Sequence, residues 1–147
     1  MASKRRPKTA TLRTGMTYSE AAAAVEAAWP GLMFELFEPS GDYYHNSIFA
    51  TTAQVAGDKV LGDPAAGERS LRVTASTTEK ELLSFGMSAF GLAVVLMYRR
   101  YGAGANERPA TVGELHALAE HYRAAFVAKN GREPHNGDSA SLEGWFG

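Results

Sequence analysis

The sequence feature that most constrains the fold is the stretch over residues 76–101, STTEKELLSFGMSAFGLAVVLMYRRY. Its apolar part, residues 85–98, contains one polar side chain, Ser88, and otherwise only apolar residues and glycines. A run this apolar is expected at the centre of the fold. Glutamates at the start and arginines at the end suit a helix dipole, and Ser76 or Thr77 can provide the N-cap. We therefore predict one long buried helix on which the rest of the chain packs.

The same stretch is a poor candidate for a membrane span. Residues 82–98 number seventeen, at the lower limit of the roughly 20 that a spanning helix needs, and they include Ser84, Gly86 and Gly91. The small residues instead predict that another backbone lies close to this helix, either from the same chain or from a second subunit. A core helix is the preferred interpretation, and no membrane partner is expected.

The other elements follow from capping, periodicity and turn residues. Thr17 and Glu20 have the spacing of a capping box before a run of alanines, which predicts a helix over residues 17–30. A second box opens an amphipathic helix over residues 111–130, with Gly131 as its stop. Alternating apolar residues predict three strands, of which the first two form a hairpin: residues 32–37, 43–52 and 70–75.

This order of elements predicts an α+β fold. We expect a small, mainly antiparallel sheet of about three strands, packed on the long apolar helix and flanked by the amphipathic helices. The expected organisation is a basic disordered arm over residues 1–15, one domain over residues 16–131, and an irregular tail with an aromatic end over residues 132–147. No internal repeat is evident in the sequence.

Composition narrows the possible chemistry. A chain of 147 residues with 45% hydrophobic residues can bury a core without metals or disulfides. The absence of cysteine excludes disulfides, thiol nucleophiles and cysteine-ligated metal centres, and it fits a cytoplasmic protein or a subunit of a viral or nucleoprotein particle. No cofactor and no metal are expected.

The net charge of −1 conceals an uneven distribution. Five of the fifteen basic residues lie in the first thirteen positions with no acid among them, whereas the rest of the chain is acidic on balance. A flexible basic segment can bind nucleic acid through its phosphates without sequence selectivity, can act as a localisation signal, or can simply keep the chain soluble. The candidate nucleic-acid-binding residues are Lys4, Arg5, Arg6, Lys8 and Arg13.

The C-terminal end carries large apolar side chains where chain ends usually carry few. Leu142, Trp145 and Phe146 either dock on the protein's own surface or contact another subunit, as aromatic interface residues do. They are the candidate partner-binding residues.

Catalytic and metal sites find little support. His116 and Glu120 share a helix face, but His121 lies about 140° away around the helix, so the three do not converge on a metal. His45 with Glu35 or Glu38 from the hairpin is the one candidate acid-base pair. The glycine-rich connector over residues 102–106 lacks the lysine and the strand-to-helix context of a phosphate loop.

The leading functional hypothesis is a non-enzymatic interaction or assembly protein. It would form a homo-oligomer or join a larger complex, with the arm and the tail as contacts. By analogy of layout, that complex would be a viral or nucleoprotein assembly. The alternatives are a sequence-nonspecific nucleic-acid-binding protein and a small enzyme with a His/carboxylate site on the hairpin.

Overall fold

The structure is a computed structural model that describes residues 8–37, 57–99, 101, 109–135 and 144–145. The fold is α+β, as predicted. In chain order the helices and strands of the described residues are β1 (Ala10–Arg13), α1 (Tyr18–Ala28), β2 (Met33–Phe37), a 3-10 helix (Pro64–Ala66), β3 (Ser70–Val73), α2 (Glu79–Phe85), β4 (Ala93–Tyr98), α3 (Val112–Asn130) and β5 (Gly144–Trp145). α2 continues directly into a single π-helical turn over Gly86–Phe90.

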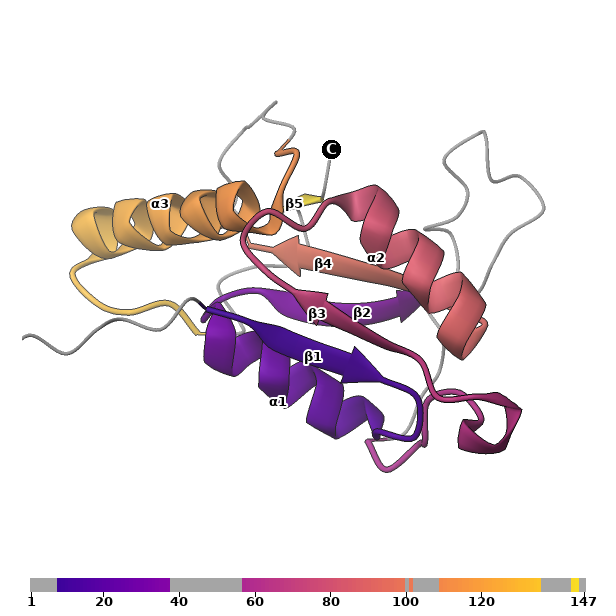
Figure 1. Ribbon diagram of the computed structural model, residues 1–147. Coiled ribbons are helices and arrows are strands. Elements are labelled where there is room, and N and C mark those ends of the chain that lie inside the picture. The colour runs from indigo at the N-terminus through magenta and orange to yellow at the C-terminus, as the bar shows by residue number, and fades with distance from the viewer. Residues whose placement is uncertain (1–7, 38–56, 100, 102–108, 136–143, 146–147) are drawn as a thin grey trace, which may run out of the picture.

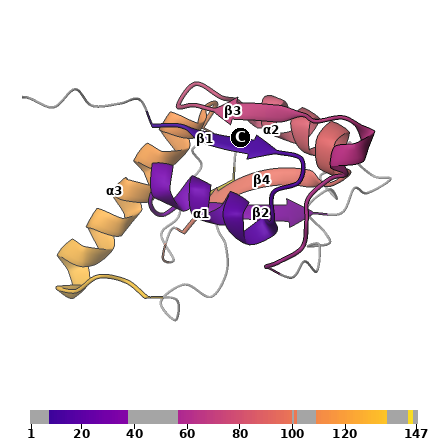
Figure 2. The same ribbon diagram turned by 60° about the horizontal axis from the view of Figure 1, so that its bottom comes forward.

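The strands form two separate antiparallel sheets in place of the single sheet expected. One is a two-stranded ribbon of β1 and β3, and the other has the order β2-β4-β5. In Figure 1 the β1–β3 ribbon lies in front of the β2–β4 pair, with α1 below and α2 and α3 above. Figure 2 shows the same two pairs of strands stacked one above the other, with α1 at the front.

The chain contains two successive units of the same order, β1-α1-β2 and β3-α2-β4. Equivalent strands of the two units pair with each other, β1 with β3 and β2 with β4, both antiparallel. The sequence gives little sign of this relationship, because the helices differ in length and one of them ends in the π-helical turn.

Threonine caps explain where the helices begin. Thr17 and Thr78 each accept a hydrogen bond from the backbone of a glutamate three residues later, and that glutamate accepts one in return from the cap's own N–H. At α3 the side chain of Thr111 accepts from the amide of Glu114, but the carboxylate of Glu114 accepts from Ala110 instead. The predicted helices over residues 17–30 and 111–130 are therefore confirmed, and so is the left-handed stop at Gly131.

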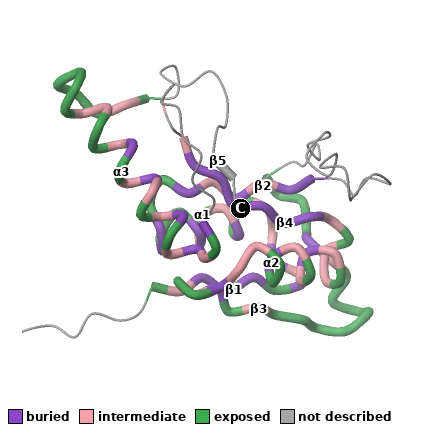
Figure 3. Tube along the Cα trace, turned by 90° about the horizontal axis from the view of Figure 1, so that it is seen from above, coloured by how far each residue is buried: buried purple, intermediate pink, exposed green. Residues whose placement is uncertain are grey.

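The main core lies between the two sheets and the helices. The inward-facing side chains of β1 and β3 meet one face of β2 and β4, and α1, α2 and α3 cover the sides. Tyr98 of β4 stacks on Tyr122 of α3, with ring centroids 5.9 Å apart. Figure 3 shows the buried segments gathered here and the far end of α3 exposed beyond them. The most buried large side chains include Trp29, Leu12, Leu36, Leu96 and Leu115.

The prediction of one long helix over residues 76–101 is wrong for the second half of that stretch. The helix cap is Thr78, the α-helix ends at Phe85, and residues 93–98 form strand β4. Gly91, with φ +72°, is the left-handed residue that ends the π-helical turn and allows the chain to reverse into the strand. The sheet of β2 and β4 has a second apolar cluster on its other face, so β4 is buried on both sides and has no polar alternation that would mark it as a strand.

Two other boundaries also change. β1 covers Ala10–Arg13, so these four residues, which were predicted to belong to a disordered arm over residues 1–15, form a strand. The strands predicted over residues 32–37 and 70–75 are present as β2 and β3, whereas the partner predicted over residues 43–52 lies outside the described residues. In the part of the chain that the structure describes, no helix has both the length and the apolarity to cross a membrane.

Candidate anion-binding surface

The outer face of the β1–β3 ribbon is a polar surface. Alternation along the two short strands places Ala10, Leu12 and Val73 in the core, and it leaves the intervening side chains exposed. The exposed positions are two arginines and two hydroxyl residues, which we call the basic ribbon face: Thr11, Arg13, Ser70 and Arg72.

Strand register sets the spacing of these groups. Thr11 pairs with Arg72 and Arg13 pairs with Ser70, so the two arginines lie on opposite strands as diagonal neighbours, each facing a hydroxyl residue. Neither strand contains an acidic residue, although the charge of Arg13 also acts on the carboxylate of Glu20 at the start of α1. Guanidinium and hydroxyl donors are the side-chain groups that most often contact phosphate oxygens, because they donate one or more hydrogen bonds and arginine adds a permanent charge.

Backbone hydrogen bonds hold the ribbon together where β1 ends and β3 begins. The amide of Thr14 donates to the carbonyl of Arg69 at 3.0 Å, and the amide of Arg69 donates to the Thr14 hydroxyl oxygen at 3.1 Å. Thr14 is 5% exposed, although its side chain is polar. Arg69 is exposed and directly precedes β3.

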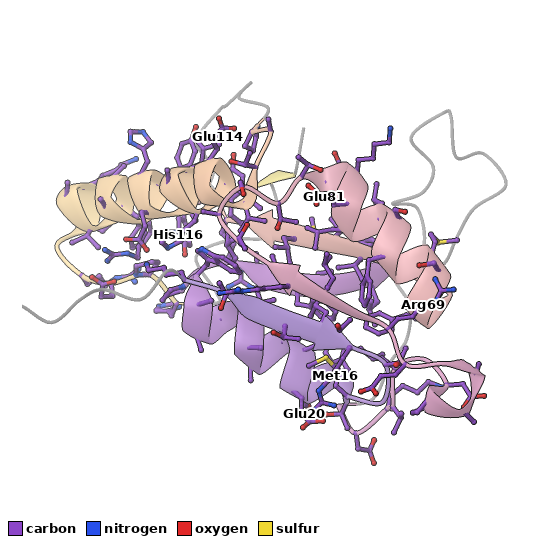
Figure 4. The ribbon with its side chains drawn as sticks, viewed as in Figure 1. Met16, Glu20, Arg69, Glu81, Glu114 and His116 are labelled. Carbon is purple, nitrogen blue, oxygen red and sulfur yellow. The ribbon has the colours of Figure 1, made fainter. Side chains whose placement is uncertain are left out.

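The structure places the predicted nucleic-acid-binding residues in two groups. Arg13 is on the basic ribbon face, and Lys8 is exposed at the other end of β1. The charge of Lys8 contributes to a lowered pKa of His116, so Lys8 lies near α3. In Figure 4 Arg69 lies near the end of β1, whereas His116 lies on α3 at the opposite side of the view. The remaining three, Lys4, Arg5 and Arg6, lie outside the described residues.

Arg72 and Arg69 were missed as candidate site residues. The alternation over residues 70–75 places Arg72 on the polar side of a strand, but nothing in the sequence indicates that this strand pairs with the end of the arm. Pairing of segments about sixty residues apart is a property of the whole fold, which local patterns do not report.

His116 and Glu120 form the ion-pair geometry expected for residues four apart on a helix. Nε2 of His116 lies 3.6 Å from a carboxylate oxygen of Glu120, and it has no hydrogen-bond partner among the described residues although it is buried. Desolvation and the charge of Lys8 lower the pKa of His116, while Glu120 and a hydrogen bond with the backbone of Pro30 oppose that shift. The side chain of His116 is 17% exposed and that of Glu120 is 43% exposed, so only the histidine of this pair is largely enclosed.

Glu120 also belongs to a surface ion network. Arg123 contacts Glu120 at 3.3 Å and Glu133 at 2.8 Å, which joins α3 to the segment that follows it. His121 is exposed and packs edge-on against the ring of Tyr122. The described residues contain no group of three or more His, Asp or Glu side chains placed to hold a metal.

The candidate acid-base pair on the hairpin is only partly described. Glu35 lies in β2 opposite Val95, on the sheet face that carries the second apolar cluster. Desolvation raises the pKa of Glu35, and the charge of Arg99 opposes this shift. His45 and Glu38 lie outside the described residues, so the geometry of that pair stays a prediction.

Of the predicted partner-binding residues, Trp145 lies in β5. Its backbone pairs antiparallel with Met97 at the edge of β4. Leu142 and Phe146 lie outside the described residues, as does the glycine-rich connector over residues 102–106.

Comparison with known proteins gives no match: no family model, no curated protein and no solved structure resembles this chain significantly.

Proposed function

We propose that this chain is a non-enzymatic interaction protein that binds a polyanion, namely the phosphate backbone of a nucleic acid, through its basic arm and the basic ribbon face. The observation that carries the proposal is the pairing of β1 with β3. It sets Arg13 beside Arg72 on an exposed surface free of acidic strand residues, directly continuous with the arm. The positive charges of the arm would then add to those of the ordered basic ribbon face.

The chemistry of the basic ribbon face favours binding without sequence selectivity. Its side chains are arginine, serine and threonine, and none of them is aromatic. They can neutralise and hydrogen-bond phosphates, but they offer no ring on which a base could stack. Affinity should therefore come mainly from counterion release and should depend steeply on salt.

The test compares two double variants of the full chain. Arg13→Gln with Arg72→Gln removes the charges of the basic ribbon face, whereas Lys80→Gln with Lys129→Gln removes two exposed charges from α2 and α3. Binding of a fluorescent single-stranded oligonucleotide is measured by anisotropy at several salt concentrations. The slope of log affinity against log salt is negative, and each phosphate contact on a single strand contributes roughly 0.7 to its magnitude. Because the ribbon variant loses two such contacts, we expect the magnitude of its slope to be smaller than that of the parent by about 1.4.

The control variant should keep the parent slope. Equal slopes for the parent and the ribbon variant would refute the role of the ribbon face. Removing residues 1–7 tests the arm separately, and this truncation ends before β1, so the ribbon is retained.

Self-association through the tail is a second candidate function, and the pairing of β5 with β4 favours it. β5 has only two residues and occupies the edge of β4, a position that the tail of another copy could equally fill. Light scattering on the parent and on a chain lacking residues 141–147 tests this candidate. A monomer in both cases contradicts it, whereas a parent oligomer that dissociates on truncation supports it.

A further inference from the structure

A cavity of about 530 Å³ opens at the end of the β1–β3 ribbon, where β1 ends and β3 begins. We call it the ribbon-end cavity. This volume lies within the range of small-molecule sites. Three segments line it: the residues around Thr14 and Arg69, the stretch 59–67, and the π-helical turn with the residues that follow it.

Backbone hydrogen bonds fix the wall that carries Lys59. The amide of Tyr18 donates to the carbonyl of Lys59 at 2.9 Å, and the amide of Leu61 donates to the carbonyl of Met16 at 2.8 Å. Arg69 is fixed by its two hydrogen bonds with Thr14. Both cationic residues therefore project from a backbone that is already ordered without ligand, which reduces the entropy cost of binding.

The opposite wall is the π-helical turn Gly86–Phe90, a type of turn that occurs frequently at functional sites. The two walls touch at Gly62: a Cβ there would lie 2.5 Å from the carbonyl oxygen of Ala89. Phe90 is held edge-on against Phe85, with ring centroids 5.2 Å apart. The shape of the cavity thus depends on close contact between segments far apart in sequence.

The lining of the ribbon-end cavity includes both cationic and apolar side chains. The cationic lining residues are Lys59 and Arg69. The lining has a single carboxylate, Asp63, one oxygen of which already accepts a hydrogen bond from the amide of Ala65. Val60, which lines the cavity, is 48% exposed, and no other large apolar side chain in the described part of the chain is classed as exposed. An exposed valine beside two cations suits a ligand that has both an anionic and an apolar part.

We propose that the ribbon-end cavity binds a phosphate monoester of an apolar or aromatic group, with the phosphate on Lys59 and Arg69 and the apolar group against Val60 and Phe90. Two positive charges match a dianionic phosphate better than a single carboxylate. The same chemistry is available from a free phosphate ester or from the terminal phosphate and base of a nucleic-acid strand. The site rests on the cavity and not on the proposed polyanion function, and the two can fail separately.

The first experiment titrates the isotopically labelled full chain with phenyl phosphate, inorganic phosphate and benzoate, followed by amide chemical shifts. Phenyl phosphate should shift the amides of residues 59–62, 69 and 88–92 and should bind more tightly than either of the other two probes. Shifts confined to other residues, or equal affinity for benzoate and phenyl phosphate, would overturn the proposal.

Matched variants locate the site. Lys59→Met with Arg69→Met should weaken phenyl phosphate about tenfold or more, since each lost contact is a charge-assisted hydrogen bond. Arg13→Gln with Arg72→Gln should leave that affinity unchanged, because neither residue lines the cavity. Unchanged affinity in the Lys59/Arg69 variant would overturn the proposal. Val60→Ser should weaken phenyl phosphate but not inorganic phosphate, and equal effects on both probes would refute the apolar contact.

The source of the phosphate is identified with oligonucleotides that carry or lack a 5′-phosphate. A gain in affinity from the 5′-phosphate that disappears in the Lys59/Arg69 variant assigns the site to a nucleic-acid end. The absence of such a gain, together with binding of phenyl phosphate, assigns it to a free ester. Both outcomes support the site, and they are read independently of the salt slope that tests the ribbon face.

Discussion

Thr14 and Arg69 join the ends of β1 and β3 through two hydrogen bonds, one to a carbonyl oxygen at 3.0 Å and one to the Thr14 hydroxyl at 3.1 Å. In the second bond, the side chain of Thr14 provides the acceptor that a backbone carbonyl would provide in a continuing strand pair. This contact is shared by the basic ribbon face and the ribbon-end cavity, because Arg13 and Ser70 lie on one side of it and the cavity on the other.

Replacing Thr14 with valine should therefore destabilise the fold without changing its shape. The Arg69 amide loses its acceptor in a partly buried position, and we expect a loss of about 1–2 kcal/mol in the free energy of unfolding. Thr14→Ser keeps the hydroxyl oxygen and should cost clearly less. Chemical denaturation of the two variants checks this, and a valine variant as stable as the serine variant would show that the bond contributes little.

Gly62 and Gly91 provide a matched pair for testing the contact between the cavity walls. Their φ angles are nearly equal, +74° and +72°, but a Cβ on Gly62 would meet Ala89 and Thr14, whereas a Cβ on Gly91 would meet nothing within 4 Å. Gly91→Ala should cost about 1–2 kcal/mol for the left-handed backbone alone. Gly62→Ala should cost more, because the wall must also shift. Equal losses in unfolding free energy would argue against close contact at Gly62.

Gly91 also shows why the sequence of residues 76–101 led to the incorrect prediction of one long helix. The small residues of residues 76–101 predicted a helix with a close neighbour along one face. Gly86 does have such a neighbour, because a Cβ there would lie 2.5 Å from the carbonyl oxygen of Leu92. Gly91 is instead a left-handed residue in open space, where the chain turns from helix into strand. A segment that is buried on all sides shows no alternation of apolar and polar residues. Periodicity therefore cannot distinguish a helix from a strand here, and only the length of the run and the positions of its glycines are informative.

Short-range sequence signals correctly predicted the features that depend on neighbouring residues, namely where α1 begins and where α3 begins and ends. The Thr17–Glu20 box, the start of α3 and the Gly131 stop are all set by residues within one turn of each other, and all three are present. The pairing of β1 with β3 joins segments far apart in the chain. The sequence therefore supplied Lys8 and Arg13 as candidates, whereas Arg72, Arg69 and Lys59 became visible only when the strands and loops were placed together.

The capping box of α1 should give the fold part of its acid sensitivity. Hydrogen bonds from the backbone and side chain of Thr17 lower the pKa of Glu20 below its ordinary value of 4.5, and Arg13 adds to this shift. A carboxyl whose pKa is lowered by folding stabilises the fold above its unfolded pKa, and this contribution is lost as the pH falls through the folded pKa.

Glu20→Gln separates the charge from the hydrogen bond, because the amide oxygen can still accept from the backbone of Thr17. We expect the variant to lose less stability than the parent when the pH falls below about 4.5. Thermal unfolding from pH 7 to pH 3 measures this difference. Glu26→Gln is the control at another α1 position, and a parent and Glu20 variant with parallel pH profiles would contradict the prediction.

His116 should make stability depend on pH near neutrality. Burial lowers its pKa below the ordinary 6.5, the charge of Lys8 lowers it further, and these effects exceed the opposing ones from Glu120 and Pro30. The unfolded chain then binds the proton more readily than the folded chain. The contribution of neutral His116 is therefore complete above pH 6.5 and is lost as the pH falls through the folded pKa.

Two substitutions and one control test this assignment. His116→Gln should flatten the pH dependence of the unfolding free energy between pH 6.5 and pH 5, whereas His121→Gln, at the exposed neighbouring position, should leave it unchanged. Lys8→Met should raise the pKa of His116, measured from its ring proton shifts, because one repulsive charge is removed. A His116 pKa at or above 6.5 in the parent would contradict the effect of burial, and no response to Lys8→Met would contradict the effect of the Lys8 charge.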